Sequence, residues 1–423
     1  MLRLVRKKPR AKAFALAVLM CAAMSGCVEK DTYIPHEDAN AVSFSWWGKD
    51  QRTEYTLAAV DAFEKKTKIP VEVHFGEYEG FKKHMDMQFY SDTEADVMQL
   101  NYDWLYEYSP DGEGFYDLNE LDDYIDLSVF SEKDLECATI NGKLNALPTS
   151  FNAITFYYNK KMYESYGLDL PETWDDVIKA AEVMGPDGVY PLELSPKSAW
   201  LSAAAYYEQT TGNKLYSGSE LRLTKDGYRT MLEFYLSLIE AGVTPGGDKF
   251  NRNDLENKKC AGLSVWISDA EYYCDPSLDK GLDIVVGDYL QTKNASLFGW
   301  YKKPTSLYAI KKDTKHPYEA ARLMDFLENS KQMNTLQKLG KGIPVSKAAL
   351  EILEAHDMLK GIQFDANEKM KSESRFEMMS PYIEDTDAVE LFSDTAKKIS
   401  EGRLTMDEAL EQTYDQIKEL IGS

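Results

Sequence analysis

The folded part of the chain opens with segments whose hydrophobic period switches between two and about 3.6. Apolar and polar residues alternate where a strand is expected, and apolar residues recur every three or four positions where a helix is expected. These five segments cover residues 42–46, 53–68, 71–75, 79–90 and 95–100. The order strand, helix, strand, helix, strand is typical of a parallel α/β sheet. Ligands of such sheets lie beyond the carboxyl ends of the strands, so the segments that follow the strands are candidates for binding.

The same alternation restarts after residue 150. Thr173 and Asp176 have the spacing of a capping box at a helix start, and so do Thr405 and Glu408. The pattern predicts further strands near 154–158, 261–266, 283–287 and 306–310, and further helices near 198–211, 226–241, 316–339, 387–400 and 406–421. Since the first half is revisited near residue 305, we expect two α/β lobes joined by more than one crossover. Several crossovers form a hinge, which suits closure on a ligand.

The first 27 residues have the pattern of a secretory signal peptide. Six basic residues precede an apolar run over 13–23, which is too short for the ~20 residues that span a bilayer. Cys27 follows Ser25 and Gly26 at the expected cleavage point, and this arrangement resembles the bacterial lipobox. We therefore expect cleavage after residue 26 and lipidation of Cys27, with ordinary secretion as the alternative. The mature protein would then lie on the extracellular face of the bacterial cell membrane, held there through its lipid alone.

Polar residues without a periodic pattern follow the lipobox. Residues 28–40 have the composition of a flexible linker between lipid and fold. The expected division of the chain is a signal peptide over 1–26, a lipidated tether over 27–40, a first lobe over 41–150 and 305–350, and a second lobe over 151–304 and 351–423.

Composition and charge narrow the range of partners. The 423 residues are 43% hydrophobic, with 48 Lys and Arg against 71 Asp and Glu. Loss of the signal peptide would leave 42 basic residues and a formal charge of −29. A surface of this sign argues against binding to nucleic acid or to anionic lipid headgroups. We attribute the acidic surface to solubility, and we expect a monomer.

Motifs for catalysis, metals and cofactors are missing from the sequence. The five histidines are scattered, at positions 36, 74, 84, 316 and 356, and none forms a metal-binding spacing with cysteine. The chain contains no Gly-x-Ser-x-Gly, Walker A or Gly-x-Gly-x-x-Gly string. We therefore expect no catalytic residue, no metal and no cofactor.

Five longer segments follow one another in a distinctive order. They are SFSWWGKDQRTEYTLAAVDAFEKKT, ADVMQLNYDWLYEY, NGKLNALPTSFNAITFYYNKKMYESYGLDLPETWDDV, GWYKKPTSLYAIKKDTKHPYEAARLMDFLENS and LGKGIPVS. In sequence and spacing, up to about residue 346, they resemble the extracellular solute-binding proteins of carbohydrate ABC importers, the maltose-binding-like family. The resemblance implies a two-lobed periplasmic-binding-protein-like fold of type II, with parallel-type sheets flanked by helices. It also implies capture of an oligosaccharide between the lobes and its delivery to the permease subunits of an ABC transporter.

Sugar binding needs aromatic faces that stack on pyranose rings and planar polar groups that bond hydroxyls. Residues of these types lie at the predicted strand ends and helix starts, and Arg52 also matches the Trp-Trp-Gly…Arg pattern of the resembled family. The candidates are Trp47, Arg52, Asp103, Trp104, Asn152, Trp200, Trp266, Asp269 and Trp300. Each has a simpler alternative, which is core packing for the tryptophans and helix or turn capping for the aspartates.

Two other functions are compatible with the sequence. An extracellular glycosidase or lyase needs a pair of carboxylates, which 71 acidic residues do not exclude. The same fold could also bind a polyamine or another cationic solute between acidic and aromatic side chains. Turnover of an oligosaccharide would identify an enzyme, and calorimetry with spermidine against an oligosaccharide panel would separate the two binding functions.

Overall fold

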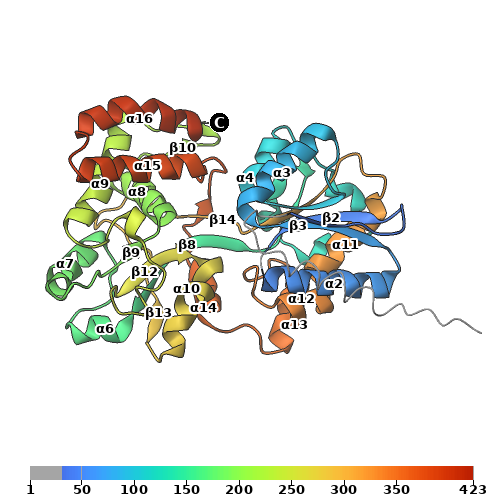
Figure 1. Ribbon diagram of the computed structural model, residues 1–423, viewed down its shortest axis with the longest axis horizontal. Coiled ribbons are helices and arrows are strands. Elements are labelled where there is room, and N and C mark those ends of the chain that lie inside the picture. The colour runs from blue at the N-terminus through green and yellow to red at the C-terminus, as the bar shows by residue number, and fades with distance from the viewer. Residues whose placement is uncertain (1–30, 49, 423) are drawn as a thin grey trace, which may run out of the picture.

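The computed structural model describes residues 31–48 and 50–422, so the predicted signal peptide and Cys27 lie outside the described residues. Two lobes lie side by side, each with its own sheet, and extended strands run between them (Figure 1). Among the described residues, no helix has both the length and the apolar character that crossing a membrane requires.

The first lobe contains a six-stranded sheet with the order β1-β3-β2-β4-β15-β7. Its strands are β1 (Thr32–Ile34), β2 (Val42–Trp47), β3 (Val71–Gly76), β4 (Val97–Leu100), β7 (Leu147–Pro148) and β15 (Leu307–Ile310). β2 pairs in parallel with both β3 and β4, as the alternating pattern predicts. The carboxyl ends of these three strands therefore meet at one edge of the sheet.

Helices cover both faces of this first sheet, with α3 and α4 on one side and α2 and α12 on the other (Figure 1). The helices of this lobe are α2 (Gln51–Thr67), α3 (Tyr78–Ser91), α4 (Tyr102–Tyr108), α11 (Pro317–Asn329), α12 (Lys331–Gln337) and α13 (Lys347–Ala355). α13 packs against α11 and α12. The expected division at residue 350 falls inside α13, and the connection to the second lobe follows at residues 356–361.

The second lobe is organised around β8 (Phe151–Asn159), whose nine residues are all buried. β8 pairs antiparallel with β12, β13 and β14. The two outer strands of the sheet pair in parallel with β12 and β14, so the sheet of this lobe is mixed. The other strands are β9 (Glu193–Leu194), β12 (Gly262–Trp266), β13 (Ile284–Val286), β14 (Tyr301–Pro304) and β16 (Glu377–Met378), with a separate hairpin of β10 (Tyr216–Ser217) and β11 (Glu220–Leu221).

Helices of the second lobe begin largely where the sequence predicts. The side chain of Thr173 accepts a hydrogen bond from the backbone N–H of Asp176, and the same box forms at Thr405 and Glu408. Both predicted capping boxes are confirmed. The helices are α6 (Lys160–Ser165), α7 (Trp174–Met184), α8 (Pro196–Thr211), α9 (Lys225–Glu240), α10 (Ala270–Asp279), α14 (Ile362–Ser372), α15 (Thr386–Ser400) and α16 (Met406–Leu420).

Three chain segments come together where the lobes join. Thr149 and Ser306 bond through both backbone and hydroxyl groups. The hydroxyl of Ser150 lies 2.6 Å from Thr305 Oγ1 and donates to the carbonyl of Lys341 at 2.5 Å. Gly342, next to Lys341, has a positive φ of 93°. The loop around Lys341 is therefore fastened to both strands that cross between the lobes.

Candidate functional site

Aromatic side chains gather at the carboxyl edge of the first sheet. Trp47 ends β2, and its ring lies 5.1 Å from the ring of Trp104 on α4. Both tryptophans are buried. Tyr78 at the start of α3 stacks on Trp104, with ring centroids 5.8 Å apart, and is 45% exposed. The exposed aromatic face of this group is therefore that of Tyr78, with Trp47 and Trp104 supporting it from behind.

Asp103, at the start of α4, lies beside these rings. Its Oδ1 atom is buried and has no hydrogen-bond partner among the described residues. Burial raises the pKa of Asp103 to about 6, Lys303 acts in the opposite direction, and Glu384 raises the pKa further. A buried carboxylate oxygen without a donor is costly in the free protein and suits a ligand that brings a hydroxyl group.

Charged groups of the second lobe face Asp103. Lys303 on β14 and Glu384 form a buried ion pair, and Lys197 Nζ lies 3.3 Å from Glu384. Burial would raise the pKa of Glu384, but Lys303 and Lys197 hold it below its usual value. Lys303 Nζ also lies 5.0 Å from the ring centroid of Trp266. The partly buried ring of Trp266 therefore lines the same region.

Asp269 and Arg52 connect the two lobes electrostatically. Burial raises the pKa of Asp269, and the strongest opposing influence is Arg52, which belongs to α2 of the first lobe. Asn152 supports this region, because its side chain donates to Ser268 Oγ at 2.9 Å and accepts from the backbone N–H of Ser268 at 3.1 Å. The amide groups of Asn152 are therefore committed to holding the turn that presents Asp269.

Trp200 and Trp300 lie elsewhere. Both are buried in the core of the second lobe, at 0% and 3% exposure. The indole N–H of Trp200 donates to the carbonyl of Ile383 at 2.7 Å, and that of Trp300 donates to the carbonyl of Leu290 at 2.9 Å. Their polar atoms are satisfied inside the lobe, so we do not carry these two residues into the proposed site.

We call the remaining group the interlobe cluster, and it combines predicted residues with others that the sequence did not single out. The predicted members are Trp47, Arg52, Asp103, Trp104, Asn152, Trp266 and Asp269. The added members are Tyr78, Lys197, Ser268, Lys303 and Glu384. Tyr78 lies two residues after the end of β3, and this position could have identified it. No sequence pattern marks Lys303 and Glu384 as candidates. β14 and the loop before α15 reach the cluster only because the chain crosses between the lobes.

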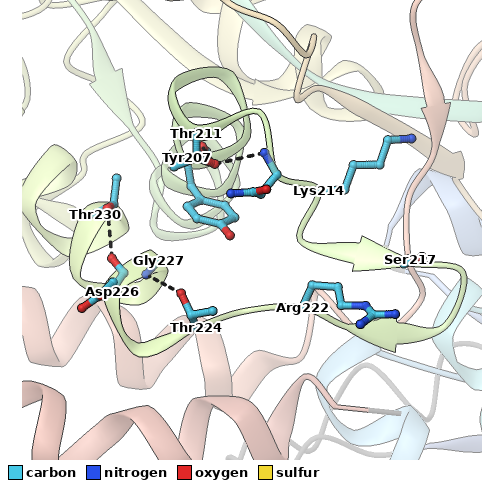
Figure 2. A pocket seen from close by; sticks show the side chains of 10 residues that line it. Tyr207, Thr211, Lys214, Ser217, Arg222, Thr224, Asp226, Gly227 and Thr230 are labelled. Carbon is cyan, nitrogen blue, oxygen red and sulfur yellow. Dashed lines mark hydrogen bonds between the residues drawn. The ribbon is translucent and has the colours of Figure 1, made fainter.

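Two cavities lie outside the interlobe cluster. One of about 540 Å³ is lined by the end of α8, the β10-β11 hairpin and the start of α9, all in the second lobe (Figure 2). Closure of the lobes would not enclose a ligand there. Another of about 760 Å³ lies between Tyr102 and Tyr106 of α4 and the segment 376–383. Lys302 lines this cavity, whereas the next residue, Lys303, faces Trp266 and Glu384. Adjacent residues of a strand point to opposite sides, so the cavity and the interlobe cluster lie on opposite sides of β14.

Comparison with known proteins points to one family. Residues 49–334 match the family model for bacterial extracellular solute-binding proteins. A solved oligogalacturonide-binding protein from Yersinia enterocolitica, in complex with saturated digalacturonic acid, is 30% identical with a TM-score of 0.81. That match covers 90% of this chain and 98% of the other.

Curated relatives agree with this match. The galactooligosaccharide-binding protein of Bacillus subtilis is 20% identical over 419 residues, covering 97% of this chain and 96% of the relative. A putative binding protein of Brucella abortus is 28% identical over 251 residues, which is 56% of this chain. The chain spans 58% of the length of that relative. All three similar proteins are named as binding proteins.

Proposed function

We propose, from the premise that this chain belongs to the family of bacterial extracellular solute-binding proteins, that it binds an oligosaccharide between its lobes and delivers it to the permease of an ABC importer. The observation that carries the choice of a sugar is the buried, unpartnered Oδ1 of Asp103 beside the exposed ring of Tyr78. An aromatic face next to a lone acceptor suits a pyranose ring and its hydroxyl.

The mechanism is a shift between open and closed arrangements of the lobes. Arg52, Tyr78 and Asp103 belong to the first lobe, and Trp266, Asp269 and Lys303 to the second. A sugar that bonds both sets at once binds the closed arrangement more tightly, and this difference in affinity draws the lobes together. The two strands that cross between the lobes at Ser150 and Thr305, together with the loop of Lys341 that is fastened to them, supply the hinge. No covalent step is involved, so the chain acts as a carrier and not as an enzyme.

The relatives and the charges of the interlobe cluster support one class of sugar. The two named sugar-binding relatives bind sugars of the galacto series, one acidic and one neutral by its printed name. The interlobe cluster carries the cations Arg52, Lys197 and Lys303 as well as acids. Three cations disfavour a polyamine, because like charges repel. They are compatible with a galacturonide carboxylate, which is the second candidate beside a neutral galacto-oligosaccharide.

Titration calorimetry of the full chain tests this proposal. The ligands are galacto-oligosaccharides, saturated digalacturonate, malto-oligosaccharides and spermidine. We expect binding of a galacto-configured oligosaccharide and none of spermidine, with the affinity about tenfold lower in Asp103→Asn. Asp123→Asn, an exposed acid of the same lobe, is the matched control and should bind as the wild type does.

Two results would contradict the proposal. One is tight binding of spermidine with no response to any sugar. The other is release of shorter sugars on incubation, detected by chromatography, which would make the chain an enzyme.

The location of the chain is a further part of the proposal. We propose that cleavage precedes Cys27 and that its thiol is lipidated, so that the protein is anchored at the extracellular face of the membrane. Cys27→Ser should then release the protein from the membrane fraction into the medium. Retention of this variant in the membrane fraction would contradict lipid anchoring at Cys27.

A further inference from the structure

Three side chains from separate parts of the first lobe meet at its surface and are not members of the interlobe cluster. They are Asp31, His74 and His84, and one ligand atom of each lies within 4.8 Å of the others. The rings of His74 and His84 are 4.3 Å apart between centroids. His84 Nδ1 lies 3.1 Å from Asp31 Oδ2. Two imidazoles and one carboxylate therefore converge on one point.

The fold holds these donors in place through three elements. Asp31 directly precedes β1, which pairs antiparallel with β3, the strand that carries His74. His84 lies on α3, which follows β3. The carboxylate of Asp31 sits against Gly76, where an added Cβ atom would lie 2.0 Å from Oδ1. The lack of a side chain at Gly76 is thus what gives Asp31 its place beside the histidines.

A further side chain orients one of the imidazoles. Gln88, one helical turn after His84 on α3, has its side-chain amide 3.2 Å from Nδ1 of His74. A histidine that binds a metal through one ring nitrogen usually has the other nitrogen held by such a polar partner. His74 is buried, whereas about a third of the His84 side chain and about a quarter of the Asp31 side chain are exposed to solvent. The group is therefore partly rigid and open to solvent on one side.

We propose that Asp31, His74 and His84 bind a divalent transition-metal ion of the zinc class, with water completing the coordination. Two imidazole nitrogens and one carboxylate oxygen form a donor set that Zn²⁺ accepts. Metal bonds of about 2.0–2.1 Å place tetrahedral donors about 3.3 Å apart, so the widest pair has to close by at most about 1.5 Å. Rotation of the partly exposed Asp31 and His84 side chains supplies this movement.

The ion would join the start of β1 to β3 and α3. β1 has three residues, and two of them are exposed, so its own pairing fixes this edge weakly. Asp31 lies four positions after Cys27 in the sequence. A bound metal would hold the end of the expected tether against the first lobe, which is a role separate from sugar binding.

Titration of the metal-free full chain with ZnCl₂ tests the site. We expect one Zn²⁺ per chain in the wild type, and an affinity about tenfold or more lower in both Asp31→Asn and His84→Gln. His36→Gln is the matched control, since His36 lies on the same segment outside the cluster, and its affinity should equal that of the wild type. Zn²⁺ at a fixed concentration that saturates the wild type should raise its melting temperature by about 2–4 °C and raise that of the two variants by less.

Hydrogen exchange gives a second readout that does not depend on affinity. Zn²⁺ should slow amide exchange at residues 32–34 in the wild type and leave it unchanged in His84→Gln. Equal melting temperatures of wild type and variants without metal would show that the variants fold. Failure of the wild type to bind Zn²⁺, an unchanged affinity in either variant, or an equal loss in His36→Gln would overturn the proposal.

Discussion

Asp103 destabilises the free protein at neutral pH, because its carboxylate has lost water without gaining a donor at Oδ1. Because the buried charge is unfavourable, the pKa of Asp103 rises from an ordinary value of 3.8 to about 6. The folded state binds the proton more tightly than the unfolded state does. The penalty is therefore complete above about pH 6 and disappears as the pH falls below 3.8.

Asp103→Asn should accordingly stabilise the protein while it weakens sugar binding. The pKa difference corresponds to about 2–3 kcal/mol in the free energy of unfolding at pH 7, and the gain should be lost near pH 4. Thermal unfolding at both pH values measures it, with Asp123→Asn as control. Stabilisation of the same size at both pH values would show that the charge is not its cause.

Ligand affinity should depend on pH through the same group. In the proposed function the carboxylate of Asp103 accepts a hydrogen bond from a sugar hydroxyl, and protonation of the carboxylate removes much of this capacity. With a pKa of about 6, affinity should fall about tenfold between pH 7 and pH 5. Calorimetry at both values measures the change. An equally steep fall in Asp103→Asn would assign the pH dependence to another group.

Single positions show what can and cannot be read from the sequence. Asp103 follows a predicted strand, and the structure places it where the lobes face one another. Trp200 and Trp300 satisfied the same criterion of residue type and position, but they lie in the core. The sequence does not tell which face of an element a tryptophan occupies when both faces are buried, as in the second lobe.

At the scale of elements, local signals worked best. Both capping boxes form as predicted, because they depend on residues three positions apart. The helix expected over 316–339 is instead two helices, since the hydroxyl of Ser330 accepts a hydrogen bond from Met333 and starts α12. α2 begins after Asp50, one turn before the cap expected at Thr53. β1 lies in the expected tether, and its pairing with β3 is a long-range contact without a local pattern.

The hinge loop should be sensitive to its glycine. Gly342 has a positive φ, and a Cβ atom there would lie 2.4 Å from Oγ of Ser150. Gly342→Ala combines backbone strain with this clash and should lower the free energy of unfolding by about 2–4 kcal/mol. Gly402→Ala, which has a positive φ and open space around it, isolates the strain and should cost about 1–2 kcal/mol. Denaturant unfolding compares them, and equal costs would contradict a role for the contact with Ser150.

For the whole molecule, the two-lobed architecture was the most secure expectation. It rested on the repeated α/β pattern and on the order of the matching segments. The antiparallel surroundings of β8 were not foreseen, because periodicity identifies strands and leaves their direction open. The expected boundary at residue 350 falls inside α13, because α13 packs against α11 and α12 of the first lobe.

Closure should be visible in solution. We expect the radius of gyration from small-angle scattering to decrease when the bound sugar is added to the wild type. Asp269→Asn removes a second-lobe group of the interlobe cluster and should require more sugar for the same change. A scattering profile that stays constant at saturating sugar would show that binding does not close the lobes.

The short strand β1 also bears on which lobe moves when the two lobes close. It attaches residues 32–34 to the first lobe, whereas the C-terminus lies at the end of α16 in the second lobe (Figure 1). If the chain is anchored through Cys27 as proposed, the first lobe is the one attached to the membrane, and closure moves the second lobe relative to it. A docking transporter would then distinguish the loaded state by the position of the second lobe.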